Sequence, residues 1–178
     1  VNNWTPNIAP SSPQVISAAR EAAGAGPDDF LVVYVGRLEH VKGVDLLIDA
    51  FRALPGAKLK LAVVGVGLDA AAMNARGAGD PRIRFIGYSS TPTAWYGAAD
   101  LLVMPSRREP FALVALEAMA CEAPIVATSV DGFPEMFRGR EDCLVATENT
   151  AALSDAIAQR AARKTAPGIV RDSYDMAR

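Results

Sequence analysis

The chain has 178 residues, of which 51% are hydrophobic and 21% are charged, and its formal net charge is −2 at pH 7. This length predicts one domain with its own buried core. The charge argues against a basic nucleic-acid binder, the hydrophobic fraction excludes a disordered acidic chain, and no apolar run reaches the roughly 18–20 residues that a membrane span needs.

The hydrophobic pattern predicts helices and strands that alternate along the chain. The run Phe30–Val35 is continuously apolar, which is typical of a strand buried on both faces. A proline-rich lead-in precedes it. The predicted elements, in chain order, are helix 13–23, strand 30–35, helix 43–54, strand 59–64, helix 68–76, strand 83–86, helix 92–99, strand 101–104, helix 112–122, strand 125–127, helix 134–137, strand 143–145 and helix 150–163.

This alternation with short turns is typical of βαβ units with right-handed crossovers. We therefore expect an α/β fold, a doubly wound Rossmann-like parallel sheet of about six strands. Ligands of such sheets bind outside the carboxyl ends of the strands, so the residues that follow each strand are the candidates for function.

Two cations follow the first strand, in a loop flanked by glycines. Arg37 and Lys42 lie between Gly36 and Gly43, and together they suit an anionic ligand. The alternative is an exposed loop with two solvated cations, and the loop alone does not separate the two.

The second strand is followed by Gly65 and Gly67 in a GxGxxA pattern. A dinucleotide site of this type also needs an acidic residue at the end of the next strand, where Ile86, Gly87 and Tyr88 stand instead. This argues against a dehydrogenase cofactor domain. Two glycines that make a tight turn are a sufficient explanation of the pattern.

Two carboxylates follow the fourth strand. Glu109 lies in the loop, and Glu117 lies inside the next helix on one stripe with Leu113, Leu116 and Ala120. We expect this stripe to be buried, where a carboxylate requires partners. Sugar hydroxyls or a nearby arginine could serve, and spacing does not decide between them. The start of this helix also offers free N–H groups to a phosphate.

The only histidine, His40, excludes most zinc sites. Cys121 and Cys143 form no CxxC pair, and we expect buried free thiols in a reducing cytoplasm. The chain starts at Val1 without a basic segment followed by an apolar one. We therefore expect a piece of a longer protein, with no signal peptide.

Matching segments run in a fixed order over residues 30–160. They are Val35-Gly36-Arg37-Leu38, Lys42-Gly43-Val44-Asp45, Val64-Gly65-Val66-Gly67, Phe85-Ile86-Gly87, Ala99-Asp100, Pro105-Ser106, the Glu109 and Glu117 pair, Glu117-Ala118-Met119-Ala120, and Gly132 with Glu135. In this order they resemble the C-terminal, donor-binding half of a GT-B glycosyltransferase, and they are most similar to the family 4 retaining enzymes.

The resemblance implies roles for the side chains. Arg37 and Lys42 would hold the donor diphosphate and stabilise the leaving group, and Glu109 would contact hydroxyls of the transferred sugar. These three are the implied catalytic residues. Glu117 would bind the ribose hydroxyls, and Gly36 would line the donor site.

The resemblance also implies contacts to the backbone. The N–H groups of Phe111, Ala112 and Leu113 would meet sugar and phosphate, while Ile86, Gly87 and Tyr88 would meet the base. No cofactor and no metal are expected, because the two cations and the helix end supply the positive charge.

Three positions depart from the family pattern. Ala112 and Glu122 stand where the family usually has glycine, and Asp131 stands where a Gly-Gly turn is common. A methyl group at Ala112 could narrow the approach of the donor to the backbone.

We therefore expect a linker and lead-in helix at 1–29, a nucleotide-sugar-binding domain at 30–163, and a tail at 164–178 that packs on an absent N-terminal, acceptor-binding domain. The full protein would be a cytoplasmic hexosyltransferase that uses a nucleotide diphosphate sugar, and the chain alone would be inactive. The alternative is a non-catalytic nucleotide-binding or interaction module. No nucleic acid is expected as a partner, and membrane contact through the absent half stays open, as do the base, the sugar and the acceptor.

Overall fold

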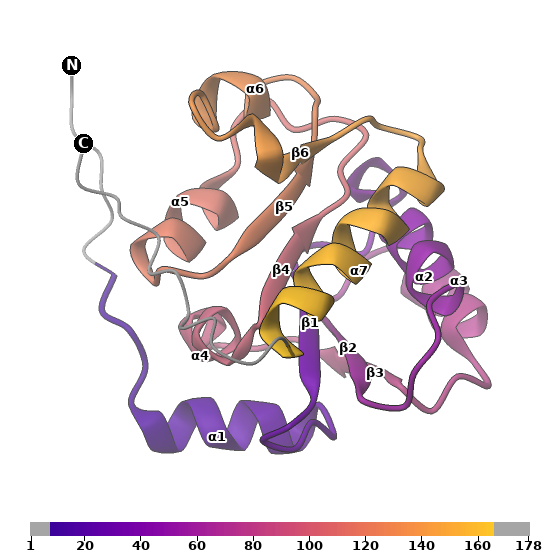
Figure 1. Cartoon of the computed structure of the whole chain (residues 1–178), viewed down its shortest axis with the longest axis vertical. Coiled ribbons are helices and arrows are strands. Elements are labelled where there is room, and N and C mark those ends of the chain that lie inside the picture. Colours follow the sequence, from indigo (N-terminus) through magenta and orange to yellow (C-terminus); the bar gives the residue numbers. More distant parts are fainter. Residues whose placement is uncertain (1–7, 166–178) are drawn as a thin grey trace.

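The computed structural model describes residues 8–165, which fold around one six-stranded parallel sheet (Figure 1). The strands are β1 (Phe30–Val35), β2 (Leu59–Val64), β3 (Ile83–Gly87), β4 (Leu101–Met104), β5 (Ile125–Thr128) and β6 (Leu144–Val145). The helices are α1 (Pro13–Ala22), α2 (Val44–Arg52), α3 (Ala70–Gly77), α4 (Pro92–Ala98), α5 (Leu113–Ala120), α6 (Phe133–Met136) and α7 (Thr150–Thr165), and two 3-10 turns are η1 (His40–Lys42) and η2 (Glu141–Cys143). No helix within residues 8–165 is long and apolar enough to cross a membrane.

The strand order is β3-β2-β1-β4-β5-β6, which confirms the predicted doubly wound Rossmann-like sheet. The order reverses between β1 and β4, which pair at Val32 with Leu101 and at Val33 with Leu102. Loops after neighbouring strands lead to opposite faces at such a reversal, and ligands of this fold bind in the resulting crevice.

Alternate residues of β1 serve two separate cores. Leu31 and Val33 belong to one core, which also contains residues of α1, α4, α5 and α6. Val32 and Tyr34 belong to the other, which contains residues of α2, α3 and α7, and all four side chains are at most 3% exposed. Side chains of a strand alternate between the faces of its sheet, so a strand covered on both faces is apolar throughout. Helices accordingly cover both faces of the sheet (Figure 1).

A buried carboxylate ties both ends of the described chain to the sheet. Asp100 accepts hydrogen bonds from the Arg20 guanidinium of α1 at 3.0 Å, from the Leu31 amide at 2.9 Å and from the Lys164 ammonium of α7 at 2.7 Å. The lead-in helix and the end of α7 are thus held at the amino edge of the sheet. Lys164 and Thr165 continue α7, while the rest of the expected tail, and residues 1–7 of the expected linker, lie outside the described residues.

Two local expectations about cysteines are wrong. Cys143 ends the turn η2 instead of starting β6, because its amide donates to the Arg140 carbonyl oxygen at 3.0 Å within that turn. Both thiols are free, and Cys143 is buried as expected, but Cys121 is only half-buried because it follows the last residue of α5 at the surface.

Glu122 occupies a backbone conformation that favours glycine. It follows the end of α5 with φ +55°, and its side chain is exposed. A left-handed residue that ends a helix is most often glycine, because a Cβ atom there approaches the following carbonyl oxygen. Glutamate in place of the usual glycine at position 122 therefore strains the backbone at the end of α5.

We predict that Glu122→Gly raises the free energy of unfolding by about 0.5–1 kcal/mol, since relief of about 1–2 kcal/mol of strain exceeds the larger backbone entropy of glycine. Urea unfolding measures the change. Glu21→Gly, inside α1, is the matched control and should lower stability by about 0.5–1 kcal/mol. Equal destabilisation by the two variants would contradict the assigned strain.

Candidate functional site

The loops that follow β1 and β4 meet at the carboxyl edge of the sheet. Gly43 has φ +66°, and a Cβ atom there would lie 2.0 Å from the Pro105 carbonyl oxygen, so only glycine allows this approach. The Arg107 amide donates to the Val41 carbonyl oxygen at 2.9 Å. The two segments with the most candidate residues therefore form one surface at the reversal of strand order.

Lys42 and Glu109 form an ion pair across these two loops. The distance from Lys42 Nζ to Glu109 Oε2 is 2.6 Å, and the side chains are 20% and 12% exposed. Ser106 Oγ donates to the same carboxylate oxygen at 3.2 Å. Ser106 is itself buried, and its carbonyl oxygen accepts from Thr128 Oγ1 at 2.5 Å. The Glu109 carboxylate is therefore held in one place by partners from two loops.

The Glu109 backbone is fixed by Asp131. The Glu109 amide donates to Asp131 Oδ2 at 2.6 Å, and Arg108 Nε donates to the same oxygen at 3.0 Å. The amide hydrogen bond and then the guanidinium lower the pKa of Asp131 below its usual value. Asp131 has φ +45°, a conformation that aspartate tolerates better than most residues. The acid that replaces the usual glycine thus holds the Glu109 loop.

Arg37 is far more accessible than Lys42, the other candidate cation of the site. Its side chain is 67% exposed and pairs with Glu39 at 2.8 Å. Such an exposed pair contributes about 0–1 kcal/mol, so Arg37 can turn to another anion at little cost. Tyr34 Oη donates to the Arg37 carbonyl oxygen at 2.7 Å. Burial and then the charge of Glu109 raise the pKa of Tyr34, which keeps this phenol a donor.

The expectation that Glu117 lies on a buried apolar stripe is wrong. Leu113 is 53% exposed and Ala120 is also exposed, while Ala115 and Ala118 face the core. Alanine at these two positions lets α5 lie close against its neighbours, so the larger side chains remain outside.

The partner of Glu117 is a tyrosine, so the expected alternative of an arginine salt bridge is also wrong. The hydroxyl group of Tyr96 on α4 donates to Glu117 Oε2 at 2.7 Å. Burial, followed by this hydrogen bond, raises the pKa of Tyr96, so the hydroxyl remains a donor. One carboxylate oxygen of Glu117 is thus occupied by the protein.

The start of α5 lies at the same edge of the sheet. Phe111 is 64% exposed, whereas Ala112 is 5% exposed and packs in the core cluster on that face. Ala112 has φ −91°, which any residue adopts, so alanine here causes no backbone strain. We noted from the sequence that the Ala112 methyl group could narrow the approach of a ligand to the backbone. In the structure this methyl group packs into the core instead of standing at the surface.

The GxG pair joins two loops. A Cβ atom at Gly65 would lie 1.8 Å from the Gly36 carbonyl oxygen, and one at Gly67 would lie 2.3 Å from the Leu38 carbonyl oxygen. Close approach to the loop after β1 therefore accounts for both glycines. The Gly65 amide donates to the Gly87 carbonyl oxygen at 2.8 Å, which places the end of β3 beside them. Beyond it, Tyr88 is 77% exposed and Ile86 is half-buried.

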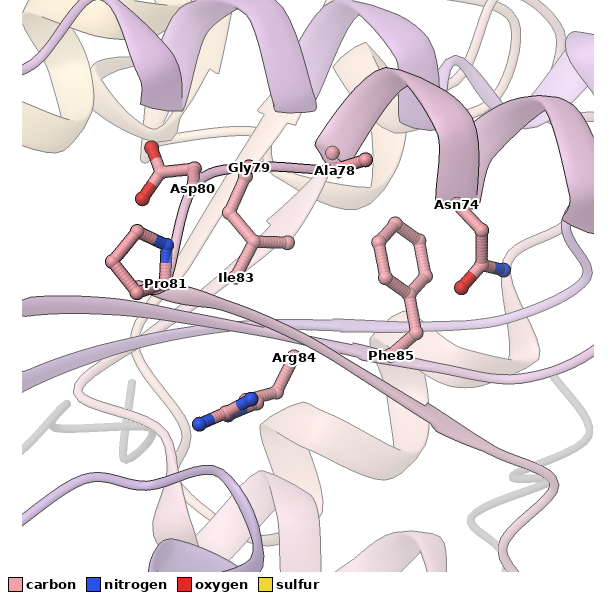
Figure 2. Close-up of a pocket in the computed structure, with 9 residues that line it drawn as sticks. Asn74, Ala78, Gly79, Asp80, Pro81, Ile83, Arg84 and Phe85 are labelled. Atoms are coloured by element: carbon pink, nitrogen blue, oxygen red, sulfur yellow. The ribbon is translucent and has the colours of Figure 1, made fainter.

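A separate pocket of about 400 Å³ lies away from these residues, between the end of α3 and the start of β3 (Figure 2). Asn74, Arg84 and Phe85 line it, and its acid Asp80 already pairs with Arg82 at 2.7 Å. This end of β3 is the amino edge of the sheet, opposite to where ligands of the fold bind. We therefore place the candidate site at the β1–β4 junction.

From the sequence we assigned no role to four side chains that hold the site. Tyr96 binds Glu117 and Asp45 binds Arg107, both distant in the chain, whereas Ser106 binds Glu109 three positions on. The sequence pattern does not indicate that Tyr96 holds a site residue, because a tyrosine among apolar residues of a helix is typical of any protein core. The serine and arginine that directly follow β4 were a usable signal, because polar residues at a carboxyl strand end are positioned for a ligand.

Comparisons with known proteins identify the family of the chain. The model of the family described as "Glycosyl transferases group 1" matches residues 29–162. The D-inositol 3-phosphate glycosyltransferase of Pseudarthrobacter chlorophenolicus is 34% identical over 162 residues, which cover 84% of this chain and 39% of the relative. This chain therefore spans less than half the length of that relative.

Two solved structures of one Anabaena protein, Alr3699/HepE, share the fold. The structure in complex with UDP matches with a TM-score of 0.76 at 27% identity, covering 87% of this chain and 45% of that chain. The structure in complex with UDP-glucose matches with a TM-score of 0.73 at 28% identity, covering 84% and 43%.

Proposed function

The chain belongs to the group 1 glycosyltransferases, and from this we propose that it is the donor-binding domain of a retaining hexosyltransferase. The observation that carries the proposal is the Lys42–Glu109 pair at the β1–β4 junction. In this proposal Lys42 would bind phosphate and Glu109 would accept hydrogen bonds from sugar hydroxyls. The UDP-glucose complex of the Anabaena relative supports a nucleotide sugar as the donor.

In this proposal the diphosphate lies between the two cations and the start of α5. Arg37 turns from Glu39 to one phosphate, and Lys42 binds the other. The first N–H groups of α5 add the positive end of the helix dipole. When the bond between the anomeric carbon and the phosphate oxygen breaks, negative charge collects on the diphosphate. Fixed positive groups at that position stabilise it, so we propose that no metal is required.

Glu109 and Glu117 would divide the recognition of the donor. Glu109 lies beside Lys42, where hydroxyls of the transferred sugar would donate to its carboxylate. Glu117 keeps one oxygen on Tyr96 and leaves the other for ribose hydroxyls. Because both carboxylates are held by protein hydrogen bonds, little side-chain entropy is lost when the donor binds.

We propose that an acceptor-binding domain outside this chain completes the active site. In the Anabaena relative the match covers 45% of the protein, which leaves room for such a domain. We also propose a cytoplasmic location, which the two free thiols favour.

The first prediction concerns the two cations. Arg37→Ala and Lys42→Ala should each weaken binding of UDP by about tenfold or more, because a charge-assisted hydrogen bond contributes about 1.5–3 kcal/mol. Calorimetry in EDTA, with GDP and ADP as parallel ligands, measures the affinity without metal. Lys58→Ala, an exposed lysine just before β2, is the control and should bind normally. Unchanged affinity in both cation variants would refute the assignment.

The second prediction separates the two glutamates. Glu117→Gln should weaken UDP and UDP-glucose alike, because it acts on the ribose. Glu109→Gln should weaken UDP-glucose more than UDP, because it acts on the sugar and its loss also frees Lys42 for phosphate. The ratio of the two affinities, measured for each variant, is the readout. A ratio that is the same in both variants would show that the division of roles is wrong.

The third prediction is that this chain binds donor but does not transfer sugar. Correct orientation of the acceptor can lower the barrier to transfer by roughly 7–11 kcal/mol. This chain alone does not provide the second wall that would hold the acceptor. The purified chain is incubated with UDP-glucose and candidate acceptors, and products are followed by mass spectrometry. Turnover of about 1 per second or faster, an ordinary enzyme rate, would contradict this account.

A further inference from the structure

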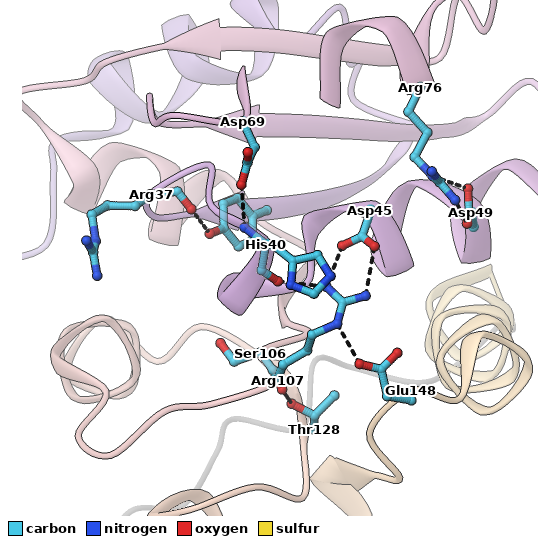
Figure 3. Close-up of polar contacts among 11 residues, drawn as sticks. Arg37, His40, Asp45, Asp49, Asp69, Arg76, Ser106, Arg107, Thr128 and Glu148 are labelled. Carbon is cyan, nitrogen blue, oxygen red and sulfur yellow. Dashed lines mark hydrogen bonds and ion pairs between the residues drawn. The ribbon is translucent and has the colours of Figure 1, made fainter. Parts of the chain in front are cut away.

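Arg107 joins three segments at the carboxyl edge of the sheet (Figure 3). Its guanidinium donates to both carboxylate oxygens of Asp45 at 2.7 and 2.8 Å, and to Glu148 Oε1 at 2.5 Å. It also donates to the His40 carbonyl oxygen at 2.7 Å. The Arg107 side chain is 14% exposed and Asp45 is 17% exposed, so this is a partly buried cluster.

These contacts lie between the two residues that carry the proposed function. His40 is two positions before Lys42, and Arg107 is two positions before Glu109. The Arg107 amide adds a hydrogen bond to Val41, the residue directly before Lys42. Arg107 therefore ties the loop of Lys42 to the loop of Glu109 through its side chain and through its backbone amide.

Arginine is the residue type that this arrangement needs. Its planar fork can bind a carboxylate through two parallel bonds while another N–H reaches a second acceptor, whereas a lysine ammonium is a point charge. Burial raises the pKa of Asp45, but the hydrogen bonds and charge of Arg107 outweigh it and hold that pKa below its usual value. The pair therefore stays charged at neutral pH.

A second arginine–aspartate pair on the same helix provides a matched comparison. Arg76 of α3 binds both oxygens of Asp49 at 2.7 and 2.5 Å. Asp49 lies one turn after Asp45 on α2, and the Arg76–Asp49 side chains are 47% and 37% exposed. This pair joins two helices and touches neither loop of the site (Figure 3).

We propose that Arg107 is a positioning residue that sets Lys42 and Glu109 at the separation a donor requires. The proposal rests on the proposed function of Lys42 as a diphosphate ligand. Arg107 acts through the loop backbone and through Asp45, and it does not itself contact the donor.

The test compares Arg107→Gln, Arg107→Lys and the control Arg76→Gln. Hydrogen exchange reports the Lys42 and Gly43 amides, which are bonded within their turn to the Glu39 and His40 carbonyl oxygens. Calorimetry reports the affinity for UDP. Arg107→Gln should speed exchange of both amides and weaken UDP binding, each by about tenfold, a change of about 1.4 kcal/mol. Arg107→Lys should give intermediate values, and Arg76→Gln should change neither.

Combination with Lys42→Ala separates positioning from general stability. If Arg107 acts through Lys42, Arg107→Gln should change UDP affinity by less than about twofold in the Lys42→Ala background, since neighbouring effects on one function are not additive. An equal loss in both backgrounds, or unchanged exchange at Lys42 and Gly43, would overturn the proposal. Should Arg107→Gln not fold, Arg107→Lys in the two backgrounds decides the question.

The outcomes also separate this inference from the proposed function. If the wild-type chain binds UDP and the Arg107 variants bind it equally well, the inference fails and the proposed function stands. If the wild-type chain binds none of UDP, GDP and ADP, the proposed function fails, and so does the role of Arg107 toward a donor.

Discussion

The ion pair between Lys42 and Glu109 is the contact on which the carboxyl edge of the sheet depends. It joins residues 67 positions apart at the one place where the strand order reverses. Two partly buried charges lose hydration when they meet, and only good geometry with further hydrogen bonds compensates this loss. Gly43, Ser106 and Asp131 supply that geometry by allowing the loops to touch and by holding the Glu109 loop.

The same pair gives the site its electrostatic character. Each cation at this edge has an acidic partner: Arg37 with Glu39, Lys42 with Glu109, Arg107 with Asp45 and Arg108 with Asp131. A donor diphosphate would therefore replace an internal partner. The exchange is easy for exposed Arg37 and costs more for half-buried Lys42, whereas Arg107 remains bound to Asp45. The three cations thus differ in exposure, and the more exposed cation can exchange its acidic partner for phosphate more easily.

The hydrophobic pattern of the sequence was sufficient to predict the fold, because each strand is marked by apolar residues that are adjacent in the chain. Residues Phe30–Val35 are apolar throughout, and this alone indicates a strand covered on both faces. The two wrong expectations about α5 have one cause, which is that tertiary packing decides which residues of a helix are buried and which side chains they meet. Helix α5 is apolar on most sides, so spacing could not select Ala115 and Ala118 as its buried residues. Likewise, nothing near Glu117 in the chain indicates that Tyr96 of α4 is its partner.

The central claim is that the β1–β4 junction binds the diphosphate of a nucleotide sugar, and a crystal structure of the chain with UDP tests it most directly. The account predicts phosphate oxygens within about 3.2 Å of Lys42 Nζ, the Arg37 guanidinium and the first amides of α5, which is hydrogen-bond distance. UDP bound instead near Asn74 and Phe85, with the Lys42–Glu109 pair and the β1–β4 junction unchanged, would contradict it.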